Sequence, residues 1–492
     1  MYNDLTAPLA LCEIVTMNNR RTKQDRIWKT LLVTGGLTLG VVGMTVMSAG
    51  ASPPVVEEVD RATDVAERAA AAESSVRTLR LEAANDEAAH SGRQRAEAML
   101  DAARQLGPLS FPEVPDDWVA AGLDLSEATR NDDGELVQVL DDGSRVIFTV
   151  DADVQQYLES MLQQTPVPHG SVVLIDPPSG RVVAKAHQSR ADSDYQYSDF
   201  SRNASPPSAS VFKVITAAAL MAEADQTPHQ EVCYHGGTRG LTQRNITGDP
   251  NFDNRCDNLE GALARSINSL IAKQTYHNLS ADHLLEWAER FGYNDTVPFE
   301  LPVEPSTAEF GDDPYERARA AAGFWHTHLS PLHGALIGAA LANDGVMMQP
   351  TIIERYEAPD GRVVFEAEPQ VWRTVMEPEM ASKLGDMMTT TAESGTARRY
   401  FGHRRAFPNS VEVSGKTGTL SNQNPFLRFT WFVGYGKHSA WEDHPGVAIG
   451  SVMANEPTWH MVGPQAASEG LRHYFNLESS RRAAQDDAVV TR

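Results

Sequence analysis

The stretch SVFKVITAAALM, residues 210–221, decides the fold because it sets a serine and a lysine at the head of a strongly apolar helix. Residues three apart in a helix share a face, so the Lys213 amine can reach the Ser210 hydroxyl. A serine is a weak nucleophile until a base takes its proton, and a lysine acts as that base only when neutral. Because apolar surroundings lower the pKa of a lysine, the stretch predicts a nucleophile and its base.

A second pattern, Ser266-Ile267-Asn268, follows in the helical stretch LEGALARSINSLIAK. We expect Ser266 to relay a proton to the departing nitrogen and the Asn268 amide to bind a peptide backbone. The pattern alone is weak evidence, because Ser201-Arg202-Asn203 also matches it. Helix capping is the structural alternative for such residues.

A third pattern, Lys416-Thr417-Gly418 followed by Thr419, lies in the expected strand VEVSGKTGTL. A strand edge can hold an extended peptide, while hydroxyls and a cation can hold its carboxylate. We expect Lys416 and Thr417 to bind that carboxylate, and Gly418 to belong to the same substrate-binding strand. We expect Thr419 to supply one N–H of an oxyanion hole. The N–H of Ser210 would supply the other. The order S-x-x-K, S-x-N, K-T-G is the signature set of penicillin-recognising serine enzymes.

Further segments extend the resemblance to the transpeptidase domains of penicillin-binding proteins over residues 150–475. SVVLIDPPSGRVVAKA resembles the family's opening hairpin, and LSPLHGALIGAALANDGVMMQP is similar to its buried helix. AESGTA and WFVGY resemble the segments beside the Lys-Thr-Gly strand. The resemblance implies an α+β fold, in which helices cover an antiparallel sheet and an all-helical subdomain adjoins it.

The resemblance also implies a peptidoglycan D,D-transpeptidase whose Ser210 is acylated by a stem peptide, and by β-lactams as inhibitors. No cofactor and no metal are expected, and cell-wall synthesis proteins are possible partners. One departure is Ala209, where the family often has glycine before the nucleophile. About 100 residues separate the expected membrane segment from the domain, too few for a glycosyltransferase domain.

Three alternatives remain at this point. A D,D-carboxypeptidase or a class D-like β-lactamase would pass the acyl group to water, and a related penicillin sensor is a further option. A β-lactamase needs an element that activates the deacylating water, and the segment FELPVEP offers no persuasive one. A non-catalytic scaffold could bind cell wall or β-lactam. A zinc hydrolase could use His326, His328 and His333, but no Glu or Cys completes the set.

The first part of the chain predicts export. Thr30 to Ala51 holds no charged residue over 22 positions, and five basic residues lie between Arg20 and Lys29. This pattern predicts a single-pass anchor in the cytoplasmic membrane with the N-terminus inside and the catalytic domain outside or in the periplasm, or a cleaved signal segment.

The expected organisation is a cytoplasmic tail (1–29), the membrane segment (30–51), a helical stalk (52–106), a linker with a β-hairpin (107–150), the transpeptidase domain (151–476) and a C-terminal tail (477–492).

Composition and cysteine content add two expectations. The formal net charge of −24 on 492 residues disfavours nucleic acid as a partner, since a polyanion would be repelled. Cys12 precedes the membrane segment, whereas Cys233 and Cys256 would both be exported. Because disulfides persist outside the cytoplasm, we expect these two to pair, the alternative being two free buried thiols.

Overall fold

The computed structural model describes only the part of the chain that follows the expected stalk. The segments 1–29, 30–51 and 52–106 lie outside the described residues. None of the helices within the described ranges has the length and apolarity needed to cross a bilayer. The described residues are 114–190, 199–238, 240–402, 407–423, 426–441, 444 and 446–490.

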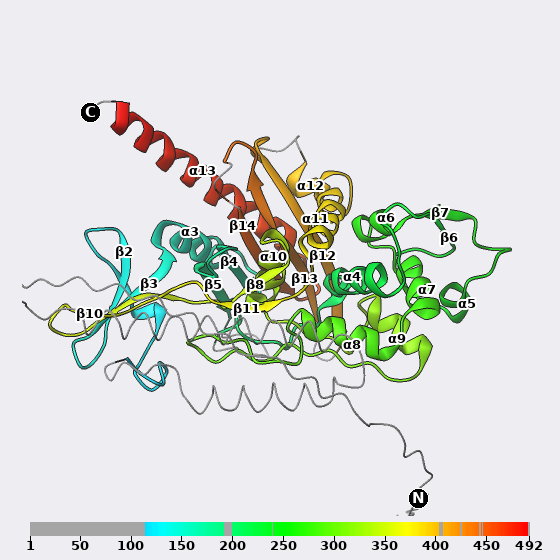
Figure 1. Ribbon diagram of the computed structural model, residues 1–492, viewed down its shortest axis with the longest axis horizontal. Helices are drawn as coiled ribbons and strands as arrows, with labels where there is room; N and C mark the ends of the chain where they lie inside the picture. Colours follow the sequence, from blue (N-terminus) through cyan, green and yellow to red (C-terminus); the bar gives the residue numbers. More distant parts are fainter. Residues whose placement is uncertain are drawn as a thin grey trace, which may run out of the picture. The chain divides into compact units, whose positions relative to one another are not determined.

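An antiparallel sheet of five strands forms the centre of the domain (Figure 1). Its order is β12-β13-β14-β4-β5, so the strand that carries Lys416 lies at one edge. In β13, Trp431 and Val433 pack with the helices of one face, while Phe432 packs with the helices of the other. This period of two shows that both faces are covered. The strands are β4 (His169–Ile175), β5 (Val182–Ser189), β12 (Val411–Gln423), β13 (Phe426–His438) and β14 (Val447–Asn455).

Helix α10 (Pro331–Ala342) lies against one face of this sheet and is buried along its whole length. Ser330 caps it, because its side-chain oxygen accepts a hydrogen bond from the His333 N–H. Small residues let the helix approach the strands closely. A β-carbon added at Gly338 would lie 2.3 Å from the Gly434 carbonyl oxygen, whereas one at Gly334 would meet only the flexible end of Val433 at 3.1 Å.

The opposite face is covered by α3 (Ala152–Gln163) and α13 (Gly463–Val490). As expected, Asp151 caps α3 by accepting hydrogen bonds from the first turn. The predicted boundary at residue 476 falls inside α13, which continues without a break to Val490. Arg481 in this continuation forms ion pairs with Asp151 and Asp153 at the start of α3, where carboxylates are also favoured by the helix dipole.

A helical subdomain adjoins the sheet near β12 (Figure 1). Every residue of α4 from Lys213 to Leu220 is buried, as its apolar composition predicts. The stretch LEGALARSINSLIAK was expected as one helix, but it forms two, with a break at Arg265–Ile267. The helices are α4 (Lys213–Glu223), α5 (Gln243–Thr247), α6 (Leu259–Ala264), α7 (Asn268–Asn278), α8 (Ala281–Arg290), α9 (Pro314–Ala321), α11 (Pro378–Glu393) and α12 (Arg398–Phe401).

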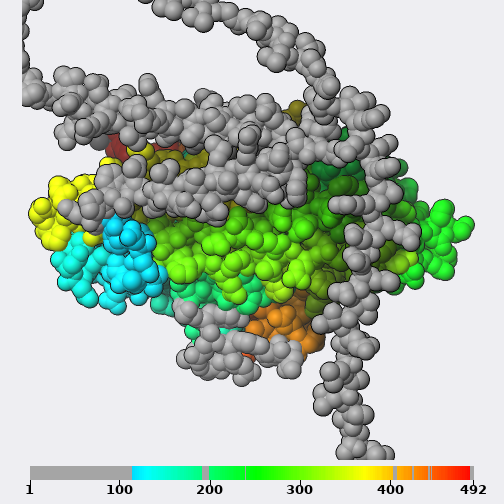
Figure 2. Space-filling view, turned by 60° about the horizontal axis from the view of Figure 1, so that its bottom comes forward, coloured from blue at the N-terminus to red at the C-terminus, as the bar shows by residue number. Residues whose placement is uncertain are grey.

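Smaller sheets complete the domain. The expected hairpin before residue 150 is formed by β2 and β3, which join β9 and β10 in a second antiparallel sheet. In the space-filling view this cyan and yellow sheet lies at one end of the green surface of the helical subdomain (Figure 2). The elements are η1 (Leu125–Glu127), β1 (Thr129–Arg130), β2 (Glu135–Val139), β3 (Arg145–Asp151), β9 (Ile353–Glu357), β10 (Val363–Glu366), and the pairs β8 (Val346–Met348) with β11 (Val371–Thr374) and β6 (Val232–Tyr234) with β7 (Arg255–Asp257).

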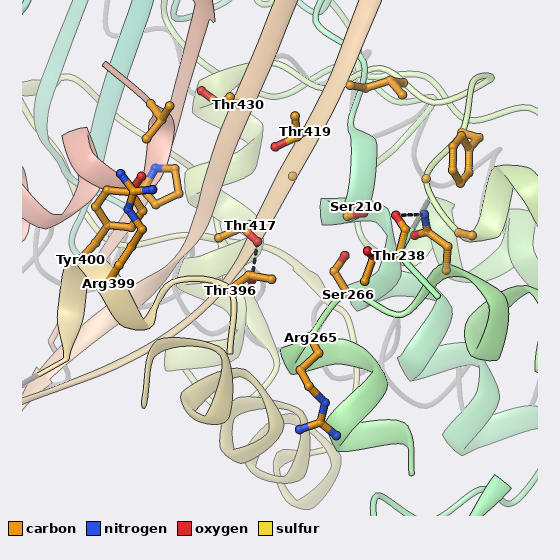
Figure 3. A pocket seen from close by; sticks show the side chains of 18 of the residues that line it. Ser210, Thr238, Arg265, Ser266, Thr396, Arg399, Tyr400, Thr417, Thr419 and Thr430 are labelled. Atoms are coloured by element: carbon orange, nitrogen blue, oxygen red, sulfur yellow. Dashed lines mark hydrogen bonds between the residues drawn. The ribbon is translucent and has the colours of Figure 1, made fainter. Parts of the chain in front are cut away.

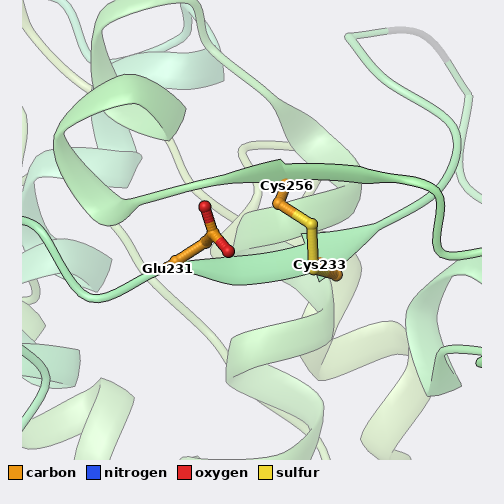
Figure 4. A group of neighbouring side chains, drawn as sticks. All are labelled: Glu231, Cys233 and Cys256. Carbon is orange, nitrogen blue, oxygen red and sulfur yellow. A yellow bond between two sulfur atoms is a disulfide. The ribbon is translucent and has the colours of Figure 1, made fainter.

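A disulfide joins Cys233 of β6 to Cys256 of β7, directly opposite each other in the ladder (Figure 4). Glu231 lies beside the bridge, but sulfurs bonded to each other are not thiolates and this group offers no set of metal ligands. The bridge closes the loop that contains Thr238. Lys273 of α7 holds the base of that loop by donating to the Cys233 carbonyl and to Asp253.

Replacing Gly338 with alanine should destabilise the domain by about 1–3 kcal/mol, because the added methyl group overlaps backbone that has little room to shift. Gly334→Ala, one turn earlier on the same helix, is the matched control and should have a smaller effect, since a side-chain methyl can move away. Urea unfolding followed by tryptophan fluorescence would measure both. Equal effects of the two substitutions would contradict the packing described for α10.

Removing the disulfide by Cys233→Ser with Cys256→Ser should lower the free energy of unfolding by about 3 kcal/mol, the chain-entropy value for a loop of this size. Unfolding of the native protein in reductant should show the same loss. The double variant should be insensitive to reductant. A native protein whose unfolding midpoint does not respond to complete reduction would refute this assignment of stability to the bridge.

Candidate active site

Ser210 and Lys213 lie at the junction of a short 3-10 helix, η2 (Ala209–Phe212), and α4. The Lys213 Nζ is 2.6 Å from the Ser210 Oγ. It also donates to the carbonyl oxygen of Ala322, which fixes the amine in place. Burial lowers the pKa of Lys213 well below its usual value, and the nearby Lys416 lowers it further. The pair therefore combines a hydroxyl with an amine that favours its neutral form.

The residue before the nucleophile is strained. Ala209 has a φ of +50°, in the left-handed region that glycine adopts without a steric cost. Its side chain makes this conformation unfavourable by roughly 1 kcal/mol. The turn is held from outside by Gly323, where an added β-carbon would lie 2.3 Å from the Ala209 carbonyl oxygen. The backbone at Gly323 and the backbone of the nucleophile are thus in direct contact.

Ser266 lies in the break between α6 and α7 and also has a positive φ, of +54°. The capping alternative does not describe it, since Ile267 occupies the N-cap of α7 and makes no side-chain capping bond. Asn268 begins α7, and its Nδ2 donates to the Thr238 carbonyl at 2.8 Å. In Figure 3 Ser266 and Thr238 lie on the same side of the pocket as Ser210.

The Lys416-Thr417-Gly418-Thr419 segment forms the opposite wall, on edge strand β12 (Figure 3). Lys416 is fully buried and donates from Nζ to the Thr417 carbonyl at 2.8 Å. Burial lowers its pKa to about 7. Gly418 lets the strand pass close to the nucleophile, because a β-carbon there would meet Ala209 Cβ and the Ser208 carbonyl oxygen at 3.3 Å.

A cavity of about 430 Å³ joins these elements. Ser210, Ser266, Asn268, Thr417, Gly418 and Thr419 all line it, so the structure brings most of the expected site residues to one place. Lys213 and Lys416 are buried behind its surface. The described lining contains no Asp, Glu, His or Cys.

Sequence reasoning missed several residues of this cavity. Arg399 and Tyr400 follow the Gly-Thr-Ala segment, Trp459 lies in the loop after β14, and Thr238 lies in the disulfide-closed loop. The helix-ending glycine in AAGF, at Gly323, was a usable signal for a tight turn. Nothing in the sequence placed that turn against Ser210.

The three histidines considered for zinc are engaged differently. His333 is fully buried in α10 and donates from Nε2 to the Phe291 carbonyl at 2.7 Å. Burial lowers its pKa to about 4, so it stays neutral. Among the described residues, His326, His328 and His333 do not form a group with metal-ligand spacing.

The family model described as the penicillin binding protein transpeptidase domain matches residues 170–468, more than half of the chain. Peptidoglycan D,D-transpeptidase PbpA of Mycolicibacterium smegmatis is 27% identical over 311 residues, covering 57% of this chain and 61% of that relative. Penicillin-binding protein PbpB of the same organism is 25% identical over 354 residues, covering 67% and 52%. The chain thus spans between half and two thirds of the length of these relatives.

Solved structures agree with the fold. The D,D-transpeptidase domain of a peptidoglycan glycosyltransferase from Eggerthella lenta superposes with a TM-score of 0.58 at 22% identity, covering 72% of this chain and 91% of that chain. PBPA from Mycobacterium tuberculosis gives a TM-score of 0.53 at 22% identity, covering 67% and 80%. With the family match over residues 170–468, these findings establish that the chain belongs to the penicillin binding protein transpeptidase domain family.

Proposed function

We propose that this protein is a serine D,D-transpeptidase that cross-links peptidoglycan stem peptides through an acyl-enzyme on Ser210. The single observation that carries the proposal is the 2.6 Å contact between Ser210 Oγ and Lys213 Nζ in a buried setting. A relative named as a peptidoglycan D,D-transpeptidase supports the choice of substrate.

In the first step, neutral Lys213 takes the proton of Ser210 as Oγ attacks the carbonyl between the two terminal D-alanines. The C–N bond breaks, and the departing amine of the terminal D-alanine receives a proton. We assign this proton delivery to Ser266, which lines the same cavity and would recover its proton from Lys213, so that the base is neutral again. In the second step the amine of a neighbouring stem attacks the ester carbonyl, a new C–N bond forms and the C–O bond to Ser210 breaks. The proton that the acceptor amine loses ends on Ser210 Oγ.

The remaining residues would hold the substrate. Asn268 would bind the donor backbone, and Thr417 with Lys416 would bind the terminal carboxylate on the strand edge. Gly418 leaves room for the strand to approach the nucleophile, as its contacts with Ala209 indicate. The N–H groups of Ser210 and Thr419 would form the oxyanion hole.

The choice of an amine over water as acceptor rests on the cavity lining. A β-lactamase of this class needs a group that activates the deacylating water, and no carboxylate lies in the described lining. The carboxylates of the segment FELPVEP are used elsewhere. Glu300 accepts from Thr351 and from the Ile352 N–H, and Glu304 accepts from Asn203 and from the Ala204 N–H.

The site's location in the cell is part of the proposal. Peptidoglycan lies outside the cytoplasmic membrane, and the uncharged segment Thr30–Ala51 with basic residues before it fits export with one N-terminal anchor. The disulfide between Cys233 and Cys256 fits the same compartment. Other cell-wall synthesis proteins remain possible partners of the anchored enzyme.

Incubation with a fluorescent penicillin should give a covalent adduct on the native protein and none on Ser210→Ala, because the β-lactam carbonyl is attacked by the same hydroxyl. Gel fluorescence and intact mass would measure it. Ser201→Ala, a serine of the unrelated S-x-N match, is the control and should retain the adduct. If the native protein forms no adduct, or if Ser210→Ala forms one, the proposal of an acyl-enzyme on Ser210 is refuted. Product analysis on a disaccharide pentapeptide would then distinguish dimers from simple D-alanine release.

Replacing Lys416 with glutamine should move the acid limb of the acylation rate to higher pH. The cation at Lys416 is one cause of the low pKa of Lys213, so its removal raises that pKa while burial still keeps it low. At neutral pH a smaller fraction of Lys213 is then neutral, and acylation slows. Single-turnover acylation by labelled penicillin, measured from about pH 5 to about pH 9, would record the pH at which the rate falls. The control Lys437→Gln, on β13, should leave the acid limb of the acylation rate unchanged. An unchanged acid limb in Lys416→Gln would contradict the effect of Lys416 on the pKa of Lys213.

A further inference from the structure

The cavity continues past Thr417, on the side away from Ser210. In Figure 3 Arg399 and Tyr400 lie beyond Thr417 as seen from Ser210, and both line the same cavity as the nucleophile. The segment that carries them is tied to the strand by a 2.6 Å hydrogen bond between the hydroxyls of Thr396 and Thr417. A substrate group held at Thr417 would therefore have Arg399 on its other side.

Arg399 is a cation without an acidic partner among the described residues. Its side chain is exposed, and its guanidinium carbon lies 4.6 Å from the centre of the Tyr400 ring. Stacking fixes the plane of a guanidinium but leaves its N–H groups, which point outward in that plane, available to a ligand. Arg265, the other arginine in the lining, differs because it is paired with Asp257.

The backbone under Arg399 is held firmly. Phe401 is buried, and its ring centre lies 4.8 Å from that of Phe432 and 5.3 Å from that of Phe407. Ser468 of α13 donates to the Tyr400 carbonyl at 2.9 Å. The four-residue helix α12 is thus packed on the sheet, and the arginine extends from a fixed base into the cavity. A charge positioned in this way loses less entropy when it binds an anion.

The reaction itself supplies an anion on this side. The amine that leaves in the first step carries a carboxylate on the same carbon, and the acceptor amine must later occupy the same place. Lys416 is fully buried and its Nζ already donates to the Thr417 carbonyl, whereas Arg399 lines the open part of the same cavity. An arginine keeps its charge at any physiological pH and matches a carboxylate with two parallel N–H groups.

We propose that Arg399 binds the carboxylate of the acceptor, so that the enzyme selects acceptors whose reacting amine and a carboxylate share one carbon. This inference rests on the proposed transpeptidase function. It assigns a substrate class: stem peptides cross-linked through a diamino diacid, whose second amine lies beside a free carboxylate. Amines without that carboxylate, such as the side-chain amine of a lysine stem, fall outside the class.

The test isolates the acceptor step. An N-acyl-D-alanine thioester with a neutral leaving group acylates Ser210 as its C–S bond breaks and the thiol leaves with the proton. D-Alanine or D-alaninamide then attacks the ester, forming a C–N bond and returning the serine. The two acceptors differ in the carboxylate and, because of it, in the basicity of the amine. The ratio of transfer to hydrolysis is therefore measured for each by chromatography and divided by the reactivity of the same amine toward the free thioester without enzyme.

After that correction the native protein should prefer D-alanine over D-alaninamide by roughly two- to fivefold, the range for one solvent-exposed charged pair. Arg399→Gln should abolish that preference by slowing transfer to D-alanine, with transfer to D-alaninamide unchanged. Arg399→Lys, which keeps the charge but not the two parallel donors, should retain part of it. Arg398→Gln is the matched control and should behave as the native protein, since Arg398 lines an adjacent cavity but not the cavity that contains Ser210.

The outcomes separate the two proposals. If native protein forms no penicillin adduct and no transfer product with either acceptor, the transpeptidase function fails and this inference fails with it. If transfer occurs but the native protein shows no preference, or Arg399→Gln keeps the preference, only the role of Arg399 is overturned. Equal labelling of all variants by penicillin verifies that each carries a folded site.

Discussion

The active site depends on keeping the Lys213 amine neutral beside the Ser210 hydroxyl, among closely packed apolar side chains. Lys213 is the first residue of α4, and the next seven residues of that helix are all buried. Removing a charged amine from water costs several kcal/mol, so the burial that stabilises the helix also shifts the amine toward its neutral form. Lys416 is buried on the facing strand, and its residual charge acts in the same direction. The same packing therefore stabilises the core and favours the neutral form of Lys213 that the reaction requires.

The sheet edge is the second constraint. An edge strand is a risk for a soluble domain, because its unpaired N–H and C=O groups can pair with other chains. Here β12 is the edge, and the segment from Lys416 to Thr419 runs along the cavity. Thr396 forms a hydrogen bond with the Thr417 hydroxyl, and α11 and η2 pack against β12. What remains open is the short stretch where a peptide strand would add, and the reactive serine lies across from it.

The sequence allowed the framework to be predicted where local chemistry decides the structure. Asp151 was recognisable as a cap, and the apolar runs around Lys416 and Trp431 were recognisable as buried strands. The spacing of Ser210 and Lys213 predicted their contact. Other features depend on contacts distant in sequence. The positive φ of Ser266 interrupts a stretch with helical composition, and the Ala322 carbonyl reaches Lys213 from 109 residues away. No local pattern indicates such contacts.

The strain at Ala209, beside the nucleophile Ser210, and at Ser266 shows how the fold balances stability against reactivity. Ala209 and Ser266 each adopt a left-handed conformation that costs on the order of 1 kcal/mol in a free chain. Each is held by packing that is far stronger: Gly323 contacts the Ala209 backbone, and the buried helices α6 and α7 flank Ser266. A turn of lower energy would point these hydroxyls elsewhere. Because the surrounding core fixes the backbone, the strained turns stay populated, and both hydroxyls line one cavity. The alanine at position 209 is tolerated for this reason, although glycine would adopt the same turn without steric cost.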